Sequence, residues 1–264
     1  MKSLIYFFSG TGNTSDVVRK LAKRLDNCSV HRFTAEELRE PKNATFSSDA
    51  EIIIWAFPTY SWGVPPVIRN IIKQGNLNFP ENAINIAVTT CGDDIGCLPK
   101  MFRSDLHQKG LRAGAVFSVI MPNTYVMMKG FDVDPEKKAS EKISNSDRAI
   151  HTIAEAINEG KISSQDDCVV KGRFAWFKTA VIYPWFVKYD MSPKGFNVDA
   201  SLCITCGKCA KICPMDNIEY DAEGHPVWGN TCAFCTACYH ICPTHAIGWK
   251  KTTKSKGQVK YFQH

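Results

Sequence analysis

Eight cysteines in the C-terminal part of the chain have the spacing that most clearly predicts chemistry. The stretch CITCGKCAKICP (203–214) is followed by CAFCTACYHICP (232–243), and the matched cysteines and prolines are offset by 29 residues. Each copy reads C-x2-C-x2-C-x3-C-P, a pattern in which three thiolates of one loop bind one iron–sulfur cluster and the fourth cysteine reaches the other cluster. The repeat therefore predicts two 4Fe-4S clusters.

The same spacing assigns the ligands of each cluster. The first set is Cys203, Cys206, Cys209 and Cys242, and the second set is Cys232, Cys235, Cys238 and Cys213. Structural zinc is the alternative, because paired CxxC motifs also form zinc ribbons. The third cysteine and the Cys-Pro end of each copy disfavour zinc. We expect the clusters to be covered by isoleucines, namely Ile204, Ile212, Ile218, Ile241 and Ile247.

The first 160 residues predict strands that alternate with helices. Short apolar runs predict five buried strands, at Ser3–Phe8, Ser29–Phe33, Glu51–Ala56, Ala83–Thr89 and Ala115–Ile120. Amphipathic segments predict helices between and after them, at Thr14–Leu25, Pro66–Gln74, Leu98–Lys109 and Pro135–Asn158. Such alternation is typical of an α/β fold whose parallel sheet is covered on both faces.

Ligands of such a sheet bind beyond the carboxyl ends of its strands, so the loops that follow the strands are the candidate sites. The loop after the first strand is SGTGNT, made of Ser9, Gly10, Thr11, Gly12, Asn13 and Thr14. Its glycines, hydroxyls and position before a helix suit a phosphate group. It has neither the Walker spacing nor a lysine, and it does not match GxGxxG, so a nucleoside triphosphate or a dinucleotide is disfavoured.

Two further loops have side chains and amides that suit a flat ring. The loop after the third strand offers aromatic side chains for stacking and consists of Pro58, Thr59, Tyr60, Ser61, Trp62 and Gly63. The loop after the fourth strand offers backbone amides for a polar ring edge, at Thr90, Cys91, Gly92, Asp93, Asp94 and Gly96. Taken singly, the aromatic side chains of one loop could simply pack in the core, and the other loop could simply form a turn. Together, at three strand ends, they predict one cofactor site.

On these loops, residues 1–160 resemble the flavodoxins, with SGTGNT similar to the phosphate loop and the PTY and CGDDIG stretches similar to the two flavin loops. The resemblance implies a doubly wound five-stranded sheet of order 2-1-3-4-5 that binds FMN. It places the phosphate on Ser9 and residues 11–14, and the ring between Tyr60 or Trp62 and residues 91–96. The chain departs from the family at Ile95, where flavodoxins often have a tyrosine.

Residues 197–250 resemble the bacterial two-cluster ferredoxins, which implies a small α+β domain. Between the two parts, residues 161–196 carry aromatic side chains and few flexible residues, which indicates a packed bridge. An insertion at 121–135 follows the fifth strand, and the sequence leaves open whether it is a lid, a partner surface or plain variation. Residues 251–264 form a basic tail that we expect to be solvated; the lysines in and beside it are Lys250, Lys251, Lys254, Lys256 and Lys260.

Composition limits the setting in which the protein works. The chain has 264 residues, a formal net charge of +6 and 12 cysteines. No export signal and no apolar run of about 18 residues is visible, so we expect no membrane span. Many cysteines without an export signal predict a cytoplasmic protein. Nucleic acid is not expected as a partner, whereas peripheral membrane association and a dimer stay open.

As a whole, the chain resembles the fused flavodoxin and ferredoxin proteins of anaerobic microbes. The resemblance implies an electron-transfer protein that holds FMN and two 4Fe-4S clusters and exchanges electrons with a redox partner, namely a ferredoxin, a reductase or a terminal enzyme. One alternative is an FMN-dependent reductase with a small organic substrate under the 121–135 insertion. Another is a redox or oxygen sensor. Whether the chain is an enzyme stays open, and no residue is assigned to catalysis.

Overall fold

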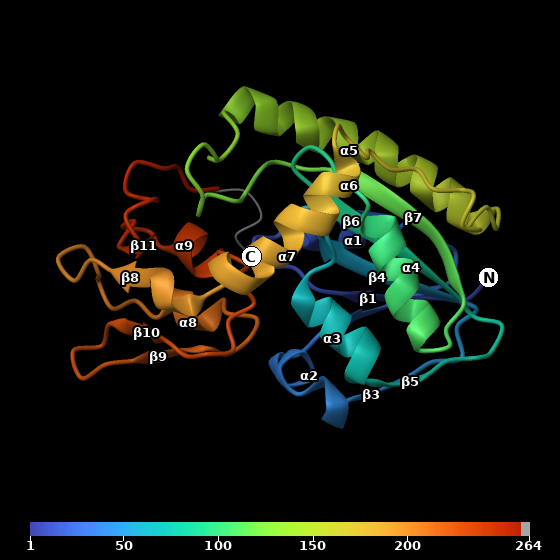
Figure 1. Cartoon of the computed structure of the whole chain (residues 1–264), viewed down its shortest axis with the longest axis horizontal. Coiled ribbons are helices and arrows are strands. Elements are labelled where there is room, and N and C mark those ends of the chain that lie inside the picture. Colours follow the sequence, from blue (N-terminus) through green and yellow to red (C-terminus); the bar gives the residue numbers. More distant parts are fainter. Residues whose placement is uncertain (260–264) are drawn as a thin grey trace.

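The larger part of the molecule is a five-stranded parallel sheet (Figure 1), in a computed structural model that describes residues 1–259. The strand order is β2-β1-β4-β6-β7, which is the flavodoxin-like order 2-1-3-4-5. The strands are β1 (Ser3–Phe7), β2 (Cys28–Arg32), β4 (Ile52–Pro58), β6 (Ile84–Cys91) and β7 (Ala113–Ile120). The sequence-based fold class and strand order are therefore confirmed, with ends that shift by one or two residues.

Helices cover both faces of this sheet, as the alternating sequence pattern predicts. One face packs against α1 (Asn13–Ala22) and α5 (Glu136–Asn158), and the other against α3 (Pro66–Gln74) and α4 (Leu98–Gln108). The central strand β4 is buried on both sides, which explains why its sequence is apolar at every position from Ile52 to Phe57. The indole of Trp55 donates to Asn85 Oδ1 at 3.0 Å, so this large core side chain keeps its hydrogen bond.

Several short elements were not expected from the sequence. A short helix α2 (Ala35–Arg39) begins at a capping box formed by Thr34 and Glu37. A parallel pair of three-residue strands, β3 (Thr45–Ser47) and β5 (Asn76–Asn78), lies beside a 3-10 turn at Pro41–Asn43. Strands of three residues are too short for a periodic pattern, so the sequence carries little signal for them.

The C-terminal part forms a separate lobe beside the sheet (Figure 1). Its elements are β8 (Phe196–Val198), α8 (Lys208–Lys211), β9 (Ile218–Tyr220), β10 (Pro226–Trp228), α9 (Ala237–Ile241) and β11 (Ile247–Trp249). β8 pairs with β11 and β9 with β10, each antiparallel. Each copy of the cysteine repeat contributes a loop, a short helix and a strand. This lobe is the small α+β unit that the repeat predicts.

The bridging segment is folded over most of its length. Residues 162–170 run beside β7, where Ala115 N–H donates to Ile162 O at 2.9 Å and Ser118 N–H donates to Cys168 O at 3.0 Å. These bonds cover the edge strand of the sheet. The chain then forms a helix from 175 to 190, which contains α6 (Ala175–Phe177), α7 (Tyr183–Trp185) and two π-helical stretches, Lys178–Ile182 and Phe186–Asp190. The π-helical stretches flank Pro184, which has no N–H to donate.

The insertion and the basic tail hold each other. Lys256 Nζ donates to the backbone carbonyls of Val126 at 2.8 Å and Phe131 at 2.6 Å, and also to that of Met128. Val126 and Met127 are buried in the core of the C-terminal lobe. The expectation of a solvated tail is therefore wrong at Lys256, because insertion carbonyls replace water around its ammonium group. Lys260 lies outside the described residues.

Replacing Lys256 by Met should lower the free energy of unfolding by about 2–3 kcal/mol, because three charge-assisted hydrogen bonds to carbonyls are lost together. Urea denaturation followed by circular dichroism measures this loss. Lys254, which is exposed, provides the matched control. Lys254→Met should change the unfolding free energy by less than about 0.5 kcal/mol, and an equal effect of the two replacements would contradict the role of Lys256.

Candidate functional site

The three loops chosen from the sequence meet at one cavity at the carboxyl ends of the strands. The first loop contributes Ser9, Gly10, Thr11, Asn13 and Thr14 to its lining. The other two contribute Pro58, Thr59, Tyr60, Thr90, Cys91 and Gly92. Segments far apart in sequence thus form one concave site where ligands of this fold class bind.

The loop SGTGNT has the geometry of an anion-binding turn. Gly12 has a φ of 104°, a conformation that favours glycine, and α1 begins directly after it. Thr14 Oγ1 lies 2.8 Å from Thr90 Oγ1, which joins the first and third loops. Asn13 Nδ2 donates to Pro122 O at 2.8 Å, whereas Asn13 Oδ1 is buried and has no hydrogen-bond partner within residues 1–259. A buried amide oxygen of this kind requires a donor.

The second loop is a strained turn. Tyr60 and Gly63 exchange backbone hydrogen bonds at 3.0 and 2.9 Å, and the central residues Ser61 and Trp62 have φ values of 43° and 64°. Positive φ at both central positions is typical of a type I′ turn, which normally uses glycine or asparagine. A left-handed conformation costs roughly 1–2 kcal/mol for each residue that is not glycine. Contacts from elsewhere in the chain must hold this turn.

Those contacts come from the bridging helix. Thr179 Oγ1 donates to Trp62 O at 2.8 Å and accepts from Cys97 N–H at 2.8 Å. The Tyr183 ring packs on Gly63, where a β-carbon would lie 2.3 Å from the ring, and the Tyr183 hydroxyl donates to Val64 O at 2.7 Å. One helix therefore binds both flanking loops at once.

Seven of the residues named from the sequence do not line the cavity: Gly12, Ser61, Trp62, Gly63, Asp93, Asp94 and Gly96. Gly96 packs against Trp62 and Thr179. Lys178 pairs with Asp94 at 2.7 Å and lies 5.0 Å from the centre of the Trp62 ring. Of the two aromatic candidates for stacking, Tyr60 lines the cavity and Trp62 faces the bridging helix.

The cavity also has walls that the sequence did not assign to it. They come from the insertion and from one cluster loop, at Pro122, Asn123, Thr124, Tyr125 and Cys235. The insertion could have been anticipated, because it follows the fifth strand and so starts at the same edge of the sheet. Nothing in the sequence indicates that Cys235 lies here.

The lining fits a phosphorylated ring cofactor such as FMN. The unpartnered Asn13 Oδ1 can accept a hydrogen bond from a ribityl hydroxyl, and the helix start at Asn13 suits a phosphate. Ser9, Thr11 and Thr14 would hold the phosphate, while Tyr60 and Gly92 would border the ring. Bound there, FMN would supply one- and two-electron chemistry that the side chains lack.

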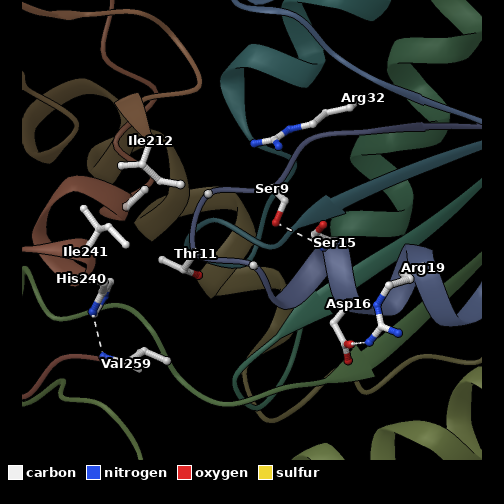
Figure 2. A pocket seen from close by; sticks show the side chains of 13 residues that line it. Ser9, Thr11, Ser15, Asp16, Arg19, Arg32, Ile212, His240, Ile241 and Val259 are labelled. Carbon is white, nitrogen blue, oxygen red and sulfur yellow. Dashed lines mark hydrogen bonds and ion pairs between the residues drawn. The ribbon is translucent and has the colours of Figure 1, made fainter. Parts of the chain in front are cut away.

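A second, wider cavity lies on the other side of the phosphate loop (Figure 2). Ser15, Asp16 and Arg19 of α1 and Arg32 at the end of β2 line one side, and Ile212 and Ile241 of the C-terminal lobe lie opposite. Thr11 lies between these two groups in the view. The sheet domain and the C-terminal lobe therefore touch over only part of the surfaces that face each other, and this cavity separates them elsewhere.

His240 of α9 joins the C-terminal lobe to the cavity wall. Its Nδ1 accepts from Val259 N–H at 3.1 Å, so the proton is on Nε2, which donates to Thr124 O at 2.8 Å. Burial lowers the pKa of His240 to about 4, so the ring is neutral at pH 7. This bond fixes Thr124, which lines the cavity, so His240 has a packing role.

The first set of cysteines surrounds a cavity of its own. Cys203, Cys206, Cys209 and Cys242 all line it, together with Ile204, Tyr220 and Ile247. Cys209 and Cys242 are buried, whereas Cys206 is exposed. Cys242 of the second copy thus lies beside the three cysteines of the first copy, which is the grouping that the spacing predicts. Of the covering isoleucines, Ile204 is 60 % exposed and leaves this site open to solvent on one side.

The second set of cysteines is also gathered in one place. Cys213, Cys232, Cys235 and Cys238 lie close enough for their charges to interact. Burial raises the pKa of Cys232 to about 11 and also raises the pKa of Cys238, so these thiols need the positive charge of iron to lose their protons at neutral pH. Phe234 N–H donates to Cys232 Sγ at 3.3 Å, and such bonds tune cluster potentials.

Comparison with protein families identifies this lobe. A family model described as a 4Fe-4S dicluster domain matches residues 202–247. Residues 202–247 are a 4Fe-4S dicluster domain. A domain of this kind implies two 4Fe-4S clusters rather than structural zinc.

The sheet domain has distant counterparts among solved structures. Megasphaera elsdenii flavodoxin aligns at 12 % identity and a TM-score of 0.32, over 58 % of this chain and 99 % of that one. An NAD(P)H:quinone oxidoreductase from Methanothermobacter marburgensis aligns at 12 % identity and 0.35, over 58 % and 96 %. The Trp repressor binding protein of Bacillus subtilis aligns at 14 % and 0.34, over 56 % and 96 %. No curated protein sequence matches the chain. The flavodoxin-like fold is therefore assigned from the strand order.

Replacing Asn13 by Ala should weaken FMN binding by about five- to tenfold, because the cavity loses one polar partner worth about 1 kcal/mol. Quenching of FMN fluorescence during titration of the flavin-free chain measures the affinity. Asn145, an exposed residue of α5, provides the control. Asn145→Ala should bind FMN like the unmodified chain, and unchanged affinity in Asn13→Ala would argue against this cavity as the FMN site.

Proposed function

We propose that the protein transfers electrons between the two 4Fe-4S clusters of its C-terminal domain and an FMN bound in the cavity of its flavodoxin-like domain. The observation that carries this proposal is that Cys235, a ligand of the second cluster, lines the same cavity as the SGTGNT loop. A 4Fe-4S cluster exchanges single electrons, whereas FMN accepts one or two. Clusters and FMN together can therefore collect two electrons that arrive one at a time.

The chain's own residues supply the frame for this transfer. Thr179 and Tyr183 hold the loops beside the cavity, and His240 and Lys256 hold the insertion against the cluster domain. A rigid arrangement of this kind keeps the two cofactor sites at a constant separation. Rates of electron tunnelling fall steeply with distance, so a constant short separation favours transfer.

The setting and the partners of the protein are part of the proposal. No disulfide joins any of the twelve cysteines, all of which lie within residues 1–259, and this supports a reducing cytoplasmic compartment. An anaerobic source is proposed from the resemblance to the fused flavodoxin and ferredoxin proteins. No helix of residues 1–259 is both long and apolar enough to cross a bilayer. External electrons would come from or go to a protein partner, namely a ferredoxin, a reductase or a terminal enzyme. Nucleic acid is not among the proposed partners.

The reductase alternative has less support. It places a small organic substrate under the 121–135 insertion, which would have to move for the substrate to enter. That insertion is instead fixed by Lys256 from the tail and by His240 from α9, and its Val126 is buried in the cluster domain. An anchored segment of this kind is a wall of the site rather than a moving cover.

Anaerobic purification followed by a spectroscopic redox titration tests the function. The unmodified chain should contain about eight irons and one FMN, since each of the two clusters holds four irons. Reduction of the clusters by a reduced ferredoxin should be followed by bleaching of the flavin absorbance. Stable cluster reduction without any change of the bound flavin would refute the proposal.

Replacement of one ligand tests the cysteine assignment separately. Cys206→Ala should lower the iron content to about four per chain, because one cluster is lost and the other keeps all its ligands. Iron analysis and electron paramagnetic resonance of the reduced protein measure the outcome. Cys168, which is exposed and belongs to neither set, gives the control. An unchanged iron content in Cys206→Ala would show that the ligand set is wrong.

A further inference from the structure

The second cluster site lies closer to the flavin cavity than the first does. Gly10, which lines the flavin cavity, contacts Cys235 of the second cluster site. A β-carbon at Gly10 would lie 2.5 Å from Cys235 Cβ and 3.2 Å from Cys235 Sγ. The backbone of the phosphate loop is therefore in direct contact with a ligand of the second cluster. Cys235 is at the same time a lining residue of the flavin cavity. The second cluster site and the flavin site thus share a wall.

Tyr60 occupies the remaining part of this shared wall. Its ring packs against the core of the sheet domain and also against the core of the cluster domain. Tyr60 and Cys235 line the same cavity. The hydroxyl is buried and has no partner within residues 1–259. Tyr60 is thus placed between the second cluster site and the flavin ring site.

The first cluster site has no such contact. The residues that line its cavity all belong to the cluster domain, between positions 203 and 247. Cys206 is exposed and Ile204 is 60 % exposed. On the side of Ile212 and Ile241, the cavity of Figure 2 separates the cluster domain from α1. This site therefore faces solvent and is remote from the flavin loops.

We propose that the centres work in a fixed order. The cluster at Cys203, Cys206, Cys209 and Cys242 exchanges electrons with an external one-electron carrier, and the cluster at Cys213, Cys232, Cys235 and Cys238 connects it to the flavin site. Tyr60 is the positioning residue that keeps the second cluster loop and the flavin ring site together. The inference rests on the proposed function and adds the path and the surface at which a carrier binds.

The electron balance follows from this order. Each encounter oxidises one carrier molecule by one electron and adds that electron to the chain at the exposed cluster. Two encounters, with two protons from water, balance the two-electron reduction of a flavin. In the reverse direction the same surface releases one electron to each oxidised carrier. No further co-reactant is needed.

Two variants that each lose one cluster test the order in the full chain loaded anaerobically with FMN. In Cys206→Ala the remaining cluster should still quench the flavin fluorescence, while flavin reduction by a reduced ferredoxin should fall to the rate seen with free FMN. In Cys238→Ala the exposed cluster should still be reduced by the carrier, as its paramagnetic signal would show. Its flavin should fluoresce and stay oxidised. Cys168→Ala is the control for cysteine loss.

A milder variant serves where loss of a cluster unfolds the domain. Tyr60→Leu should keep the full iron content but slow the transfer from clusters to flavin and raise the flavin fluorescence. Tyr189→Leu, an exposed position of the bridging helix, is its control. Full-rate flavin reduction in Cys238→Ala together with quenched fluorescence would overturn the order. Absence of any transfer in the unmodified, fully loaded chain would instead refute the proposed function itself, so the two failures are distinguishable.

Discussion

The contact between the Gly10 backbone and Cys235 constrains both halves of the molecule. Residue 10 must be glycine because one side of this loop faces the cofactor cavity while the other meets the cluster loop at a distance that excludes a β-carbon. The other links between the two parts, from Lys256, His240 and Tyr183, keep this one arrangement in place. The fold is thus a flavodoxin-like domain whose SGTGNT loop has a second neighbour, and that neighbour is Cys235 of the 4Fe-4S dicluster domain.

The bridging helix, residues 175–190, binds the loop after β4 and the loop after β6 and so fixes their positions relative to each other. Thr179 binds the carbonyl of Trp62 and the amide of Cys97 with a single hydroxyl, so a shift of one loop changes the position of the other. The same helix contacts the strained turn at Ser61 and Trp62, whose left-handed conformations need support from outside the turn. The loops that border the cavity are therefore shaped by the segment that leads to the cluster domain, and not by the sheet domain alone.

The sequence predicted the parts of the structure that depend on local pattern. The run from Ile52 to Phe57 is apolar at each position because the strand is buried on both faces, and the cysteine spacing reports the exchange of one ligand between two loops. The sequence offered Tyr60 or Trp62 as the aromatic neighbour of the ring and could not choose between them, because the orientation of Trp62 depends on Thr179, which lies 117 residues further along the chain. The fixed position of Lys256 likewise depends on carbonyls about half the chain away. Such contacts leave no periodic or spacing signal.

Lys256 has a consequence for how the protein is made. The carbonyls that it binds lie 125–130 residues earlier in the chain, so the insertion cannot be fixed until the ribosome has released almost all of the described residues. Until then the insertion lacks the ammonium group that gathers its three carbonyls. This anchor of the insertion therefore forms after the rest of the described chain is in place.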